Sequence, residues 1–78
     1  MKARITNFEE KESRNGGKYI HIDFTTVTGK QYYTYIDPKK KNYHRWKKVL
    51  KVGVLLDNLK LIKSRLVNAD SNFTVVEE

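Results

Sequence analysis

Residues 18–36 have the sequence KYIHIDFTTVTGKQYYTYI, and this stretch decides the fold. Its first half alternates apolar and polar side chains with the period of two that a half-buried β-strand requires. Its second half is rich in the aromatic and β-branched side chains that strands favour. The segment Val27-Thr28-Gly29 between them suits a three-residue loop, because glycine readily adopts the left-handed conformation that such a loop needs. Residues 18–36 therefore predict a β-hairpin.

The loop length determines which side chains share a face of this hairpin. With a three-residue loop, Thr26 lies opposite Lys30, and the inner face carries the apolar residues at positions 20, 22, 24 and 36. The outer face then has Tyr33 opposite Asp23 and Tyr35 opposite His21. A two-residue loop would shift the register by one and send both tyrosines inward. We favour the first register because it buries Ile36 beside Ile20.

The segments before the hairpin and directly after it predict a strand, a connection and a helix. Residues 4–8 form a first strand with Ile5 inward, and residues 9–17 form a polar connection that ends in a turn. Residues 43–51 form a helix with an apolar stripe that includes Trp46, which we expect in the core. Asp37 or Asn42 can cap this helix, Pro38 suits its first position, and Gly53 can close it.

The last third of the chain predicts two further strands. Residues 54–62 are strongly apolar and form one strand, bent near positions 57–58. Residues 63–64 form a short turn. A last strand begins at residues 65–68, contains a bulge or turn at residues 68–71, and ends with residues 73–76. β-Branched residues near both of its ends argue against a helix there.

The resulting order is three strands, one helix and two strands, which resembles the OB-fold. The resemblance implies a mainly β protein, a five-stranded antiparallel barrel with one helix between strands 3 and 4, and a single domain over residues 1–78. The chain is similar in size and style to small OB-fold proteins that bind single-stranded nucleic acid and are encoded by phages and mobile elements. An SH3-like barrel is the alternative fold, although a basic helix of two to three turns fits it less well.

Positive charge is concentrated in the middle of the chain. The net charge is +7, and residues 18–51 contain nine basic and two acidic side chains, which accounts for the whole excess. A local excess of this kind is typical of proteins that bind polyanions, because each Lys or Arg that meets a phosphate releases condensed counterions. A solvated basic face that only confers solubility is the alternative.

Tyrosines on the outer face of the hairpin give this charge a specific interpretation. Proteins that bind single strands combine a positive groove with aromatic rings on which bases stack, and the hairpin of an OB-fold is its usual ligand surface. Lysines frame the rings at both ends of the hairpin, and the following segment adds further cations. The predicted nucleic-acid-binding residues are Lys18, Tyr19, His21, Lys30, Tyr33, Tyr35, Lys39, Lys40, Lys41, Arg45 and Lys48.

Other site chemistry finds little support in the sequence. The chain has no Cys, and neither His21 nor His44 has a second ligand at metal-binding spacing, so we expect no metal and no cofactor. The aspartates are scattered and no nucleophile–base pair is evident, so we do not expect an enzyme. The N-terminus lacks an apolar signal segment and no stretch is long enough to span a bilayer, which favours a cytoplasmic protein in a bacterial or phage-infected cell.

These features predict sequence-tolerant binding of single-stranded DNA in replication or recombination. One alternative is an RNA-binding OB-fold module, although the chain lacks the closely spaced phenylalanines of cold-shock proteins. The other is a small protein-interaction or inhibitor module that docks by a sheet edge or by the basic helix. A second copy of the chain is a further possible partner, because a thin core often needs one. A replication protein is another, if the chain works in replication.

Overall fold

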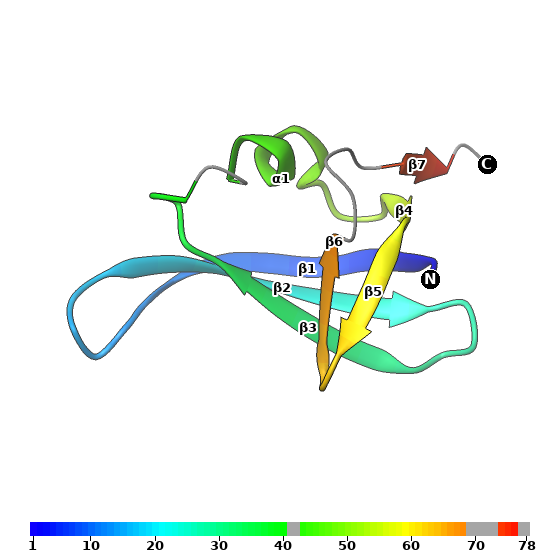
Figure 1. Cartoon of the computed structure of the whole chain (residues 1–78), viewed down its shortest axis with the longest axis horizontal. Coiled ribbons are helices and arrows are strands. Elements are labelled where there is room, and N and C mark those ends of the chain that lie inside the picture. The colour runs from blue at the N-terminus through cyan, green and yellow to red at the C-terminus, as the bar shows by residue number, and fades with distance from the viewer. Residues whose placement is uncertain (41–42, 69–73, 77–78) are drawn as a thin grey trace.

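The computed structural model describes residues 1–40, 43–68 and 74–76, which form one helix and a single mixed β-sheet (Figure 1). The sheet order is β5-β6-β3-β2-β1-β4-β7, and among the strand pairs of these residues only β3–β6 is parallel. The elements are β1 (Ala3–Glu12), β2 (Lys18–Thr26), β3 (Gln31–Ile36), α1 (Tyr43–Val49), β4 (Leu55–Asp57), β5 (Leu59–Ile62), β6 (Arg65–Asn68) and β7 (Thr74–Val76).

The β2–β3 hairpin has the predicted register. Phe24 pairs with Tyr32, and Ile20 pairs with Ile36. The turn is closed by hydrogen bonds that the Thr26 amide donates to the Lys30 carbonyl and the Gly29 amide donates to the Thr26 carbonyl. Gly29 has a φ of 87°, the left-handed conformation that the loop was predicted to need. The three-residue loop is therefore confirmed.

Strand β1 is longer than predicted and contains a β-bulge. The interpretation of residues 9–17 as a connection was wrong for residues 9–12, which continue β1 alongside β2. The register shifts by one between Ile5 and Asn7, so Thr6 is the extra residue of a bulge. Ile5 and Phe8 are three residues apart, yet this bulge turns both side chains toward the core. Their shared orientation could not be derived from simple alternation.

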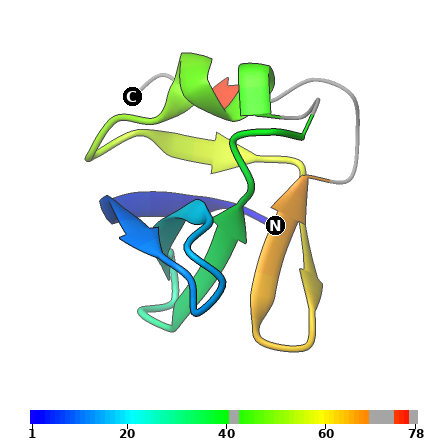
Figure 2. The same cartoon turned by 90° about the vertical axis from the view of Figure 1, so that its left-hand side faces the viewer.

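Residues 55–62 form two strands that lie at different places in the sheet. Asn58 separates them with a φ of 60°, which confirms the predicted bend. β4 pairs with β1, whereas β5 pairs with β6, so the sheet must curl for two strands one residue apart to reach both places. Figure 2 shows this curl end-on, with β1–β3 on one side and the β5–β6 hairpin on the other.

The prediction of a closed five-stranded antiparallel barrel was wrong. The sheet is a seven-stranded, mixed, curled half-barrel. Its physical cause lies in the interrupted strands: the left-handed residue Asn58 splits the fourth predicted strand, and the last predicted strand is two strands, β6 and β7. β6 lies beside β3, and β7 pairs with β4. The bulge or turn predicted at residues 68–71 lies almost wholly outside the described residues.

Helix α1 covers the inner face of the sheet. Trp46 is 4% exposed, and its ring lies 6.0 Å from that of Phe24, which confirms that it belongs to the core. The helix ends at Val49, earlier than predicted, and Gly53 (φ 96°) adopts its left-handed conformation in the turn before β4. Asp37 does not cap the helix, because its carboxylate accepts the Lys39 amide in a separate turn. The other predicted cap, Asn42, lies outside the described residues.

Candidate nucleic-acid interface

The solvent side of β2 and β3 carries the predicted tyrosines. Because side chains alternate along a strand, burial of Ile20, Ile22 and Phe24 turns the residues between them away from the core. Tyr35 is 47% exposed, and Tyr33 is half-buried. Both tyrosines therefore lie outside the core, as the preferred register predicted.

Four rings on this face form a continuous series, which we call the aromatic row: Tyr19, Tyr35, Tyr33 and His21. Tyr33 and Tyr35 stack with their centroids 5.9 Å apart. Tyr19 meets Tyr35 edge-on at 6.0 Å, and His21 lies nearly parallel to Tyr33 at 5.6 Å. Every ring contacts at least one neighbour in the row, so the hairpin presents a single aromatic surface rather than separate side chains.

Arg65 adds a cation to the aromatic row. Its guanidinium carbon lies 5.1 Å from the centre of the Tyr35 ring, a cation–π arrangement. β6 holds it there, because Arg65 pairs with Tyr33 in the parallel β3–β6 ladder. Arg65 is not among the residues predicted from the sequence, because nothing local in the chain indicates that position 65 lies beside positions 33 and 35.

An open hollow lies at one end of the aromatic row. It is lined by Tyr19, Tyr35, Ile36 and Asp37 and has a volume of about 380 Å³. Two of its four lining residues belong to the row, and Asp37 is the one charged side chain among them. The hollow therefore gives a flat, mostly apolar ligand a place against two rings.

Two further carboxylates lie beside His21 on this face of the sheet. Glu9 pairs with His21 across β1 and β2, and its side chain lies 3.3 Å from the Lys11 ammonium. Asp23 lies 2.9 Å from the His21 Nε2 atom. The carboxylates thus have local partners, and the centre of the face is less basic than the charge of residues 18–51 suggested.

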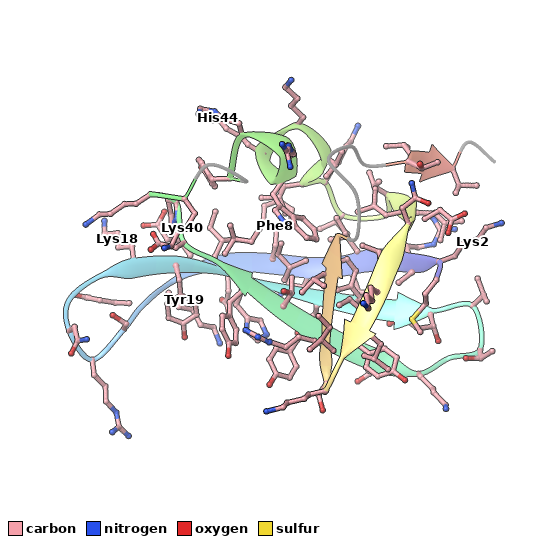
Figure 3. The ribbon with its side chains drawn as sticks, viewed as in Figure 1. Lys2, Phe8, Lys18, Tyr19, Lys40 and His44 are labelled. Carbon is pink, nitrogen blue, oxygen red and sulfur yellow. The ribbon has the colours of Figure 1, made fainter. Side chains whose placement is uncertain are left out.

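The lysines predicted to frame the aromatic row lie at the two ends of the β2–β3 hairpin, but strand alternation puts them on the side of its inner residues. Figure 3 shows Lys18 above the ribbon and Tyr19 below it, and Lys30 lines a hollow with Thr26 and Tyr32. Lys18 begins β2 and lies 3.4 Å from Glu10 in an exposed ion pair, which contributes little to stability and is easily exchanged for another anion. Lys30 closes the opposite turn, where its backbone pairs with Thr26. Both lysine side chains are exposed.

The predicted cations of the helix lie on the other side of the sheet. α1 packs against the inner face through Trp46, and Arg45 and Lys48 are exposed on this helix. Figure 3 shows His44 of α1 above the sheet, whereas Tyr19 projects below β2. Arg45 and Lys48 therefore do not extend the charge beside the aromatic row.

The turn after β3 connects the strand that carries Tyr33 and Tyr35 to the segment that leads into α1. Lys39 and Lys40 are exposed there, and Figure 3 shows Lys40 at the same end of the molecule as Lys18. Lys41 lies outside the described residues. The structure thus brings the four ring residues and Arg65 together on one face. It places Lys18, Lys30, Arg45 and Lys48 on the other side of the sheet.

Comparison with protein-family models, curated proteins and solved structures found no match to this chain. Within residues 1–40, 43–68 and 74–76, no helix has the length and apolar character needed to cross a membrane. The same part of the chain contains no group of three or more His, Asp or Glu side chains arranged to hold a metal ion. The function is therefore inferred from the geometry of the aromatic row.

Proposed function

We propose that the protein binds single-stranded DNA on the solvent side of β2 and β3. Bases stack on the aromatic row and phosphates contact Arg65, while the exposed lysines at the ends of the hairpin attract the strand at longer range. The observation that carries this proposal is a connected surface of four rings, one of them covered by an arginine, on an otherwise polar strand face. Aromatic surfaces with adjacent cations are typical of proteins that bind single strands without strict sequence preference.

The strand connectivity supports the proposal. β1 pairs with both β2 and β4, β3 pairs in parallel with β6, and β5 pairs with β6. We infer an opened variant of the OB-fold, in which β4 and β5 are the two halves of one interrupted strand. The face of strands 2 and 3 binds oligonucleotides in that fold, together with the loops that follow strands 1 and 4. The corresponding turns here contain Arg14 and Lys63.

The exposed area of the rings favours single strands over a duplex. Tyr35 offers the largest accessible ring of the row, and each base that stacks on an aromatic side chain contributes about 1–3 kcal/mol. A duplex hides the faces of its bases, so at this face it can only contact the phosphate-binding cation, Arg65. RNA presents the same base faces, and its additional 2′-hydroxyl is the group by which a site distinguishes the two.

The proposal is tested by titrating fluorescent dT, U and duplex DNA oligomers of equal length at two salt concentrations. We expect single-stranded DNA to bind most tightly and its binding to weaken as the salt concentration rises. Tyr35→Ala should weaken binding by roughly 1–3 kcal/mol because a stacking ring is lost. Tyr35→Phe keeps the ring and should retain most of the affinity.

His44→Ala is the matched control, because it removes an exposed ring from α1 on the other side of the sheet. This variant should bind like the wild type. The proposal fails if Tyr35→Ala leaves the affinity unchanged. Equal affinity for duplex and single strands would also contradict it, since only charge would then be recognised. Tighter binding to U than to dT oligomers would make RNA the ligand.

A further inference from the structure

Asp23 places a hydrogen-bond acceptor directly beside the aromatic row. It lies opposite Tyr33 in the β2–β3 ladder, and its side chain is 44% exposed. Its Oδ1 atom is 2.9 Å from His21 Nε2, and the His21 ring lies within 10° of parallel to Tyr33. The ring that ends the row therefore also holds the carboxylate in place.

The carboxylate keeps acceptor capacity for a ligand. An ionised carboxylate has two oxygens with about four lone-pair sites and donates no hydrogen bond. Among the described residues, the Asp23 side chain has only the contact with His21 Nε2. Its second oxygen is thus able to accept a hydrogen bond from the edge of a base that stacks on Tyr33 or Tyr35.

Bases differ in what they present to such an acceptor. Cytosine and adenine carry an exocyclic amino group at the edge, and acidic side chains accept hydrogen bonds from the cytosine N4 amino group. Thymine presents carbonyl oxygens on both sides of its single N–H, and these oxygens repel a carboxylate. Guanine has neighbouring N–H donors on its Watson–Crick edge. A carboxylate beside the stacking surface therefore discriminates against thymine.

The same charge also orients the strand. A negative side chain in the middle of the face repels phosphates, whereas Arg65 attracts them. The sugar–phosphate backbone is thereby directed toward Arg65 and the base edges toward Asp23.

Building on the proposed single-strand interface, we infer that Asp23 is a specificity-determining residue, which makes the site prefer bases with an exocyclic amino group over thymine. The affinity of the site for a single strand then depends on the types of base in that strand.

The test compares dC and dT oligomers of 15 nucleotides with the full-length chain. We expect the wild type to bind the dC oligomer about fivefold more tightly, the lower end of what one matched base contact gives. Asp23→Asn removes the charge while keeping the size, so the affinity for dT should rise and the preference should fall to near one. Asp23→Thr, which suits a strand, should give the same loss of preference if the asparagine variant folds poorly.

Glu9→Gln is the matched control, because it removes one negative charge from the same face but at the Lys11 pair on β1. It should strengthen binding of both oligomers by the same factor and leave the preference unchanged. Equal binding of dC and dT by the wild type would overturn the inference while leaving the proposed function intact. A preference that persists in Asp23→Asn would also overturn it. Failure to bind either oligomer would refute the proposed function and this inference together.

Discussion

Arg65→Ala tests whether phosphates bind at the proposed interface or respond only to the charge of the chain as a whole. Arg65 is half-buried, and its guanidinium lies 5.1 Å from the centre of the Tyr35 ring. Each phosphate that a protein neutralises on a single strand contributes about 0.7 to the slope of log affinity against log salt concentration. If Arg65 contacts one phosphate, the variant should lose about 0.7 from that slope. When the salt concentration rises tenfold, the loss of affinity should therefore be about five times smaller for the variant than for the wild type.

The assay is fluorescence anisotropy with a labelled 15-nucleotide strand at four or more salt concentrations. Arg45→Ala provides the matched control, because it removes the same side chain from the exposed surface of α1, on the other side of the sheet. The control should keep the wild-type slope. An unchanged slope in Arg65→Ala, or an equal loss in Arg45→Ala, would refute the assignment of phosphate binding to the outer face.

Two further predictions concern the scaffold that holds the aromatic row. Gly29→Ala should destabilise the chain by about 1–2 kcal/mol, because position 29 has a φ of 87°, which is unfavourable for a residue with a Cβ. An added Cβ meets no atom within 4 Å, so this loss comes from the backbone conformation and not from a clash. Both glycine variants are compared with the wild type by urea titration. Gly17 has no positive φ, so Gly17→Ala should change the free energy of unfolding by less than about 0.5 kcal/mol. Phe24→Ala removes a ring that is 1% exposed and contacts Trp46, so it should cost about 3–5 kcal/mol. Unfolding followed by Trp46 fluorescence checks this loss, and a midpoint close to that of the wild type would contradict the described core.

The β2–β3 hairpin could be predicted because the information that specifies it is local. Alternation along residues 18–26 assigns the inner face, and Gly29 fixes the loop length and hence the register. These two features together place Tyr33 and Tyr35 on the solvent side. Burial of Ile36 beside Ile20 was enough to choose between the two possible registers, because both residues lie within the same hairpin.

The length of strand β1 could not be predicted from its side-chain pattern. Residues 9–12 are polar and charged, so their side chains gave no reason to expect a strand. Their strand conformation comes from backbone pairing with β2, which provides hydrogen bonds whatever the side chains are. The bulge at Thr6 could not be predicted from the sequence either. It changes the side of the sheet on which Phe8 lies, and no glycine indicates its position.

The composition of the candidate site depends on contacts between distant parts of the chain. Arg65 lies thirty positions from Tyr35 and reaches it only because β6 runs parallel to β3. The contact between Trp46 and Phe24 places α1 on the inner side of the sheet, so its exposed cations lie across the sheet from the tyrosines. The sequence prediction grouped these cations with the tyrosines because both belong to the basic stretch of residues 18–51, although charge along the chain does not specify a face.

Nuclear magnetic resonance of the aromatic side chains tests the central proposal most directly. A labelled sample is titrated with a 15-nucleotide single strand, and the ring signals of the aromatic row are compared with those of His44 on α1. Stacked bases shift the signals of rings they cover, so we predict the largest changes at Tyr35 and Tyr19 and almost none at His44. Changes concentrated at His44 and the surrounding helix, with the tyrosine signals unmoved, would contradict the proposed interface.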